Sequence, residues 1–376
     1  MESVYIVSDN ILSPIGLTTK ENFDQLKNRV SGIKEHHDNA FADQPFFASL
    51  FPDKSFVNAD KNKYTFFEQL LIASISDTLG SGGINPADKK TIVIISSTKG
   101  NISLLETEPN TRELQKRIAL PFFARLVADY FGFTNDPIVV SNACISGIVA
   151  ILTGMRLIQS GLYENAVIAG ADVITKFILS GFQAFNAISP VPCKPFDINR
   201  EGITLGEGAA TIILSAKPKN NENIKVMGGA VSNDANHISA PSRSGEELNF
   251  AIKKAINEAG LSSKDIDFIS AHGTATIYND EMEAKAITLA NLENVPVNSL
   301  KGYYGHTLGA AGLIESIISI QSLRENLLIP TLGFEETGTS IPLNINHSLL
   351  TGDFKNCIKT ASGFGGCNAA VVFGKC

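Results

Sequence analysis

The segment Ile138-Val139-Val140-Ser141-Asn142-Ala143-Cys144-Ile145-Ser146-Gly147 passes from a β-branched run, through small polar residues, into a helical pattern. The apolar positions of that pattern are Ile148, Ile151, Leu152, Met155 and Ile158. A strand that turns directly into a helix is typical of α/β proteins. The turn also places Cys144 at the amino end of a helix, where the helix dipole favours thiolate over thiol. Cys144 is therefore a candidate nucleophile, although a cysteine in an apolar stretch also fits an inert core residue.

Two histidine motifs extend this prediction. His272 lies in Ile269-Ser270-Ala271-His272-Gly273-Thr274-Ala275-Thr276, at the end of a strand-like run. His306 lies in Lys301-Gly302-Tyr303-Tyr304-Gly305-His306-Thr307-Leu308-Gly309-Ala310-Ala311-Gly312, between a strand-like segment and a helix. Each histidine alone also fits a loop residue bonded to backbone, and the glycines also fit close packing. Because α/β proteins collect ligand chemistry at the carboxyl ends of their strands, Cys144 and both histidines are candidates for one site.

The sequence also repeats its own pattern. Residues 137–167 and 296–328 both contain a strand, a small-residue turn, an apolar helix and a short segment beginning Glu-Asn. A strand-like run comes before each unit, at 91–96 in the first case and at 267–270 in the second. A further run begins each half, at 5–7 and at 224–227. Strands that alternate with longer helical segments predict parallel-rich sheets. The repetition therefore predicts two related halves, each with its own sheet.

Composition limits the classes of function. The formal net charge of −7 disfavours nucleic acid as a ligand. The amino terminus has no basic start followed by an apolar stretch, and the most apolar helix is interrupted by polar residues, so neither a signal peptide nor a membrane span is expected. The five cysteines show no Cys-x-x-Cys spacing, which supports neither a disulfide framework nor a zinc site. We expect a cytoplasmic protein.

Five motifs in order resemble those of the β-ketoacyl-acyl-carrier-protein synthases, the condensing enzymes of the thiolase superfamily. They are residues 143–146, 194–208, 272–276, 301–312 and 363–368. The resemblance implies an α/β fold of the thiolase type, a five-layer αβαβα sandwich of two duplicated βα halves. It would bury the apolar helices 145–160 and 308–323 between the sheets. We expect the amino-terminal half, with the cysteine, at residues 1–217 and the carboxy-terminal half, with both histidines, at residues 223–376.

The resemblance also implies a chemistry, the decarboxylative Claisen condensation of malonyl-acyl carrier protein with an acyl group held on Cys144. Neutral His272 and His306 would stabilise the enolate, and the backbone N–H groups of Cys144 and Phe364 would form a second oxyanion hole. Lys301 could pair with Glu283 and set the protonation of the histidines, and Phe364 could gate the pocket. No metal or organic cofactor is implied, because the substrates are carried on phosphopantetheine.

We interpret the central signature around Asp197 and Arg200 as structural, because buried charge pairs commonly fix loops.

Two departures from the family pattern concern the substrate. Ile145 replaces a small residue, and the loop 96–101 carries Lys99 where a glycine-richer turn is usual. These residues are expected to line or abut the acyl channel. A specialised synthase for polyene, pigment or polyketide assembly and a synthase of fatty-acid elongation both remain open.

The expected partners are an acyl carrier protein and a second subunit, identical or related. Because acyl carrier proteins are acidic, docking requires a basic patch. The candidates are Lys61, Lys63, Arg112, Lys116, Arg117 and Arg125. The segment 120–123 and the strand at 139–140 are expected to be buried between subunits.

Two other functions share the fold. A thiolase-type acyl-CoA acyltransferase would use a second, carboxy-terminal cysteine as base, whereas the corresponding turn here carries Phe364, Gly365 and Gly366. A non-catalytic chain-length partner subunit would lack the nucleophile. The presence of Cys144 together with both histidines favours the condensing enzyme over both alternatives.

Overall fold

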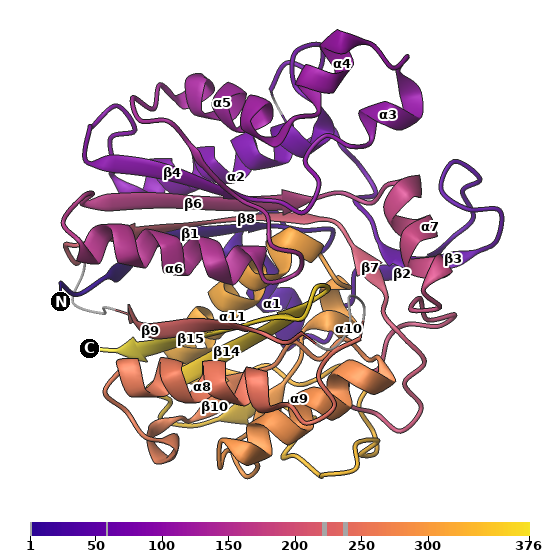
Figure 1. Cartoon of the computed structure of the whole chain (residues 1–376), viewed down its shortest axis with the longest axis vertical. Helices are drawn as coiled ribbons and strands as arrows, with labels where there is room; N and C mark the ends of the chain where they lie inside the picture. Colours follow the sequence, from indigo (N-terminus) through magenta and orange to yellow (C-terminus); the bar gives the residue numbers. More distant parts are fainter. Residues whose placement is uncertain (1, 58, 220–223, 236–239) are drawn as a thin grey trace.

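In the computed structural model, which describes residues 2–57, 59–219, 224–235 and 240–376, two sheets alternate with three layers of helices. Helices α2 (Phe66–Gly82) and α5 (Leu120–Phe131) cover the outer face of one sheet, and α8 (Glu246–Glu258) and α9 (Ile277–Leu289) cover the outer face of the other (Figure 1). Helices α6 (Ser146–Gln159) and α11 (Ala311–Glu325) lie between the sheets (Figure 1). The predicted five-layer α/β sandwich is confirmed.

The sheet of the first half has the strand order β5-β4-β6-β8-β1. These strands are β1 (Tyr5–Leu12), β4 (Thr91–Ser96), β5 (Ile138–Val140), β6 (Asn165–Asp172) and β8 (Gly208–Ser215). β4 pairs parallel with β5 and β6, and β8 pairs antiparallel with β6 and β1. β4 and β8 are buried along their whole length, which explains their continuous runs of β-branched and small residues.

The second half repeats this order as β11-β10-β14-β15-β9. Its strands are β9 (Ile224–Asn233), β10 (Phe268–Ser270), β11 (Val297–Asn298), β14 (Asn356–Gly363) and β15 (Cys367–Lys375). The duplication is therefore present, with one correction. The segment after α11, β12 (Leu327–Leu328), is not the counterpart of β6, because it leaves the sheet and pairs with β13 (Leu350–Thr351). β14 takes that place.

The two sheets meet at a narrow seam. A single residue pair, Tyr5 with Lys225, joins β1 to β9 and makes one continuous ladder of ten strands. Among the described strands, this pair is thus the one ladder contact between the two expected sheets. The predicted division between residues 217 and 223 falls largely on residues 220–223, which lie outside the described residues.

Smaller elements complete the two halves. The remaining helices of the first half are α1 (Thr19–Lys27), α3 (Leu104–Thr107), α4 (Arg112–Arg117) and α7 (Lys176–Ala184). A three-stranded sheet contains β2 (Ile33–His36), β3 (Phe46–Ser49) and β7 (Leu205–Gly206). The second half adds η1 (Ser263–Asp265), α10 (Lys301–Tyr304) and η2 (Leu308–Ala310). Within the described residues, none of the helices combines the length and the apolar character that crossing a membrane requires.

The central helices follow directly from the sequence. α6 and α11 are buried on nearly all sides, which accounts for apolar residues around most of their circumference. Their first turns cross at Gly147 and Gly312. Since Cys144 precedes α6 and His306 precedes η2 and α11, this crossing brings the two predicted motifs to the same end of the molecule.

Candidate functional site

Cys144 occupies a sharp turn between β5 and α6. The preceding residue, Ala143, has a φ of 43° in the left-handed region, where a non-glycine residue is strained. Cys144 is only 8% exposed, and the backbone of Phe364 lies beside its sulfur. The turn thus presents the thiol to a cavity instead of packing it into the core.

His272 lies two residues after the end of β10, Ser270. The carboxylate of Glu283, on α9, accepts the backbone N–H groups of His272 and Gly273 at 2.7 and 2.8 Å. Glu283 also accepts the hydroxyl of Thr360 on β14. A buried carboxylate therefore fixes the backbone that carries this histidine.

His306 lies in the turn between α10 and η2. Its backbone N–H donates to the carbonyl of Thr204 at 2.7 Å, and its carbonyl accepts the N–H of Gly206 at 3.1 Å. These two bonds attach the turn to the segment that contains β7. Neither ring nitrogen of His306 has a hydrogen-bond partner among the described residues, so both are free to meet a ligand.

The structure brings the three predicted residues together. The sulfur of Cys144 and one ring nitrogen each of His272 and His306 lie within 4.8 Å of one another. The two imidazole rings are nearly perpendicular, with centroids 5.2 Å apart. All three line a pocket of about 300 Å³. Its other lining residues include Phe182, Phe185, Thr274, Thr276, Tyr278, Ser362 and Phe364.

Burial controls protonation in this pocket. It raises the pKa of Cys144 to about 12, so the expected thiolate-favouring effect of the helix terminus is outweighed and the resting group is a thiol. Burial also holds the pKa values of His272 and His306 well below their usual range, and the charge of Lys301 lowers them further. Both histidines are therefore neutral near pH 7.

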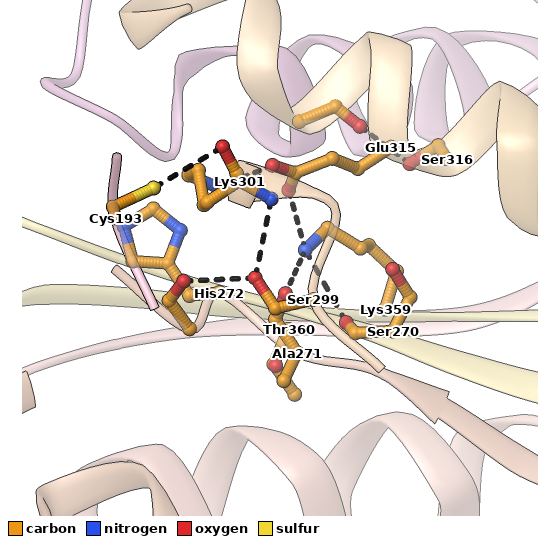
Figure 2. Close-up of polar contacts among 12 residues, drawn as sticks. Cys193, Ser270, Ala271, His272, Ser299, Lys301, Glu315, Ser316, Lys359 and Thr360 are labelled. Atoms are coloured by element: carbon orange, nitrogen blue, oxygen red, sulfur yellow. Dashed lines mark hydrogen bonds and ion pairs between the residues drawn. The ribbon is translucent and has the colours of Figure 1, made fainter. Parts of the chain in front are cut away.

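The predicted partner of Lys301 is wrong. Lys301 is completely buried and forms an ion pair with Glu315 on α11, not with Glu283. Lys359 on β14 forms a second ion pair with Glu315, at 2.7 Å (Figure 2). The reason is that both oxygens of Glu283 are occupied by the N–H groups of the His272 turn.

Phe364 lies in the turn between β14 and β15, with Gly365 and Gly366 at positive φ. Its ring stacks on Phe182 with centroids 5.4 Å apart and meets Phe185 edge to face at 5.5 Å. The predicted gating residue therefore forms part of an aromatic wall of the pocket.

The expected channel residues do not line this pocket. Ile145 is fully buried in the core beside α6. Lys99 forms a buried ion pair with Asp172 at 2.7 Å, and Asp172 also accepts the N–H groups of Thr98 and Gly309. The unusual lysine therefore fixes the end of β6 to the turn after β4, because a buried ammonium group requires a carboxylate partner.

The predicted basic residues differ in location and in pairing. Lys61, Lys63, Lys116 and Arg117 line a surface groove of about 760 Å³. Arg117 is paired with the buried Glu68, and Arg125 with Asp129 and Asp136, so these two charges are already neutralised. Arg112, on α4, is exposed and does not line the groove.

The segments expected between subunits differ in burial. β5 is the edge strand of its sheet, and Ile138 and Val139 are partly exposed there. Phe122 is exposed, whereas Phe123 packs inside its own subunit, edge to face with Phe67 at 4.9 Å. Phe123 is therefore a core residue, and its place in the predicted interface is wrong.

Several residues of the site escaped the sequence analysis. Glu315 lies in the helix 308–323, which was predicted to be apolar. No role was predicted for Lys359. A lone charge inside an otherwise apolar helix or strand was the signal that could have identified both. The signature residues Asp197 and Arg200 do fix a loop: Asp197 accepts the N–H groups of Glu335 and Glu336, and Arg200 donates to the carbonyl of Gly338.

Comparisons with known proteins agree with this geometry. The family description "Beta-ketoacyl synthase, N-terminal domain" matches residues 1–220, and "Beta-ketoacyl synthase, C-terminal domain" matches residues 224–335. The chain is 30% identical to 3-oxoacyl-[acyl-carrier-protein] synthase 2 of Vibrio harveyi, over 99% of this chain and 98% of that protein. It is 32% identical to a putative mitochondrial 3-oxoacyl-[acyl-carrier-protein] synthase of Schizosaccharomyces pombe, over 70% of this chain and 68% of that protein.

Among solved structures, a ketosynthase of Xenorhabdus doucetiae, determined in complex with its chain length factor, superposes with a TM-score of 0.91. It is 25% identical to this chain, and the alignment covers 100% of this chain and 98% of that one.

Proposed function

The chain belongs to the β-ketoacyl synthase family, and we infer that it catalyses the decarboxylative condensation of malonyl-acyl carrier protein with an acyl group held on Cys144. The observation that carries this proposal is the cluster of one thiol and two neutral imidazoles in a single pocket. An acyltransferase of this kind needs a nucleophile and two hydrogen-bond donors for an enolate oxygen, and the pocket holds each of them.

The first half-reaction exchanges one thioester for another. A neutral histidine accepts the proton of Cys144 as its sulfur attacks the acyl thioester, and then passes this proton to the departing phosphopantetheine sulfur. This relay is required because burial keeps Cys144 protonated at rest. The N–H of Phe364, whose backbone lies beside the sulfur, would bind the oxyanion of the tetrahedral intermediate.

The second half-reaction forms the carbon–carbon bond. The malonyl carboxylate leaves as CO₂ and its bonding electrons form an enolate, whose oxygen accepts N–H bonds from His272 and His306. The enolate carbon attacks the acyl carbonyl, the carbon–sulfur bond breaks, and Cys144 is released as a thiolate that takes up a proton. The released CO₂ drives the step, so the reaction requires no redox cofactor and no metal.

The same site argues against the two alternatives. A non-catalytic chain-length partner has no use for a thiol and two imidazoles that converge on one pocket. A thiolase would need a second cysteine as base. Cys367 does lie in the carboxy-terminal turn, but its sulfur donates to the carbonyl of Phe364 and it does not line the pocket.

We place the enzyme in the cytoplasm, in fatty-acid synthesis or specialised polyene or polyketide synthesis.

An acidic acyl carrier protein would dock at the groove lined by Lys61, Lys63 and Lys116, which are exposed and have no ion-pair partner among the described residues. Reversing Lys61 and Lys116 to Glu should raise KM for carrier-bound substrates and leave kcat unchanged, with a smaller effect at high salt. Lys253→Glu, on α8 at the opposite outer face, is the matched control (Figure 1).

The second subunit would pair along β5, the exposed edge of the first sheet. The Xenorhabdus ketosynthase was determined with a chain length factor, which favours a related subunit as partner. Light scattering of the chain alone and with a co-expressed related subunit would separate a homodimer from a heterodimer.

The decisive test of the reaction is intact-mass analysis. Incubation with acyl-carrier-protein primers should add an acyl group to Cys144, and malonyl-carrier protein should then release a β-ketoacyl product. The acyl group that accumulates identifies the pathway. A chain that neither takes up an acyl group nor decarboxylates malonyl-carrier protein would contradict the proposed function.

A further inference from the structure

Lys359 is a completely buried lysine in the middle of β14, between Ile358 and Thr360. Its ammonium group donates hydrogen bonds to the carbonyls of Ser270 and Ala271 at 3.2 and 3.0 Å. The same nitrogen lies 2.7 Å from the carboxylate of Glu315 (Figure 2). Burial lowers the pKa of Lys359 and the adjacent carboxylate of Glu315 raises it. Because a buried carboxylate lies within ion-pair distance of the nitrogen, we assign the charged form to Lys359.

The two carbonyls are those that precede His272. Ser270 ends β10, which pairs parallel with β14 with Ser270 opposite Lys359, and Ala271 is next to the histidine. Glu283 holds the N–H groups on the other side, at His272 and Gly273. The backbone of the His272 turn is therefore fixed by a cation at its carbonyls and by an anion at its N–H groups.

The buried charges around the histidines balance. Lys301 and Lys359 supply two positive charges, and Glu315 and Glu283 supply two negative charges. The other titratable groups that face this cluster are Cys144, Cys193, Tyr304, Asp280 and Asp172. A proton on either histidine would be an unpaired charge in this buried environment, whereas removal of one lysine would leave a net negative charge that a histidine proton could neutralise.

We propose that Lys359 is a positioning residue for decarboxylation, which fixes the backbone of His272 and, together with Lys301, places positive charge beside the two buried imidazoles. This role rests on the proposed condensing activity and deepens it. It is consistent with the lowered pKa values of both histidines, to which Lys359 contributes after burial and Lys301.

The test compares Lys359→Met with Lys359→Met/Glu315→Gln in the full chain. The single variant removes one positive charge, and the double variant removes one charge of each sign and so restores the balance. Release of CO₂ from malonyl-acyl carrier protein is measured between about pH 5 and 9, giving kcat and KM separately.

In Lys359→Met we expect kcat to fall roughly 10- to 100-fold, because the tie to the His272 backbone is lost, while KM changes little. The acid limb of the profile should move upward by about one to two pH units, because protonated histidine is no longer opposed. In the double variant kcat should stay low, but the acid limb should return toward the wild-type position. A residue with a purely structural role would not produce this return.

An acid limb that is the same in wild type and Lys359→Met would overturn the proposal, as would a double variant whose limb stays displaced. Wild-type protein that does not decarboxylate malonyl-carrier protein would instead defeat the proposed function. If Lys359→Met does not fold, ¹⁵N-histidine NMR compares the wild type with Lys359→Gln. The protonation of the histidines should move to higher pH in the variant, and an unmoved titration would refute the role of Lys359.

Discussion

Gly147 on α6 and Gly312 on α11 face each other so closely that a Cβ atom on either one would lie 2.7 Å from a backbone nitrogen of the other helix. The crossing lies three residues after Cys144 and six residues after His306. Because each helix begins just beyond its reactive residue, the approach of the two backbones sets the separation between nucleophile and imidazole.

Alanine at either glycine should force the central helices apart. We expect Gly147→Ala and Gly312→Ala each to lower the free energy of unfolding by about 1–3 kcal/mol, the usual cost of overpacking, and to reduce condensation more than malonyl binding. Gly80, on α2, has nothing within 4 Å of a built Cβ and is the matched control. Gly80→Ala should be neutral or stabilising by up to about 1 kcal/mol. Equal effects at all three positions, measured by denaturant unfolding, would contradict this.

Substitution of the nucleophile should separate the two half-reactions. Cys144→Ala should abolish acyl transfer and condensation. Cys144→Gln should retain or increase malonyl decarboxylation, because its amide imitates the acyl-enzyme carbonyl near the N–H of Phe364. His306→Ala should lose decarboxylation by roughly 10²- to 10³-fold. If Cys144→Gln lost decarboxylation as fully as His306→Ala, the assignment of the enolate to the histidines would fail.

Alkylation of Cys144 should report its raised pKa. The exposed Cys376 is first replaced by Ser, because accessibility alone makes it reactive. In that background iodoacetamide should modify Cys144, which lines the pocket, before the buried Cys193, Cys357 and Cys367. Since burial raises the pKa of Cys144 to about 12, the rate should climb with pH through the neutral range without a plateau. Peptide mapping measures the alkylation rate of Cys144 at each pH. A rate that levels off near pH 7 would indicate a preformed thiolate instead.

Asp280 should make stability depend on pH. Burial raises the pKa of this carboxyl from 3.8 to about 7, so its neutral form favours the folded state fully below about pH 3.8, and that contribution is lost as the pH rises through 7. Asp280→Asn keeps an acceptor for the N–H of Phe196. It should match the wild type near pH 4 and become more stable by up to about 4 kcal/mol above pH 7. The exposed Asp43→Asn should show no such trend in chemical denaturation.

The fold was predictable because its determinants are local and repeated. The turn at Cys144, the two histidine motifs and the apolar central helices each predict their own element, and the internal repeat predicts the second sheet. One prediction from the repeat, the pairing of the strand after α11, was wrong. β12 carries the same Glu-Asn-apolar pattern as β6, but the pairing of β12 with β13 depends on a partner far along the chain, which a local pattern does not specify.

The site was predictable in its reacting groups and less so in their supports. Cys144, His272 and His306 lie in distinctive turns, so their convergence could be inferred. The expected Lys301–Glu283 pair does not form, because the carboxylate of Glu283 is occupied by backbone N–H groups. Ile145 and Lys99 looked like channel residues from their departure from the family pattern, but departure alone does not distinguish a lining residue from a core residue.

β15 lies between β14 and β9 in the interior of the second sheet, although it follows every other strand in sequence. During synthesis on a ribosome, the first half can therefore assemble around Cys144 while the second sheet still has an empty central position. The turn that brings Phe364 to the sulfur forms only when residues through Lys375 have emerged and β15 has inserted. A nascent chain that ends before β15 would hold its nucleophile and both histidines without this turn, so the complete pocket forms only after translation has passed that strand.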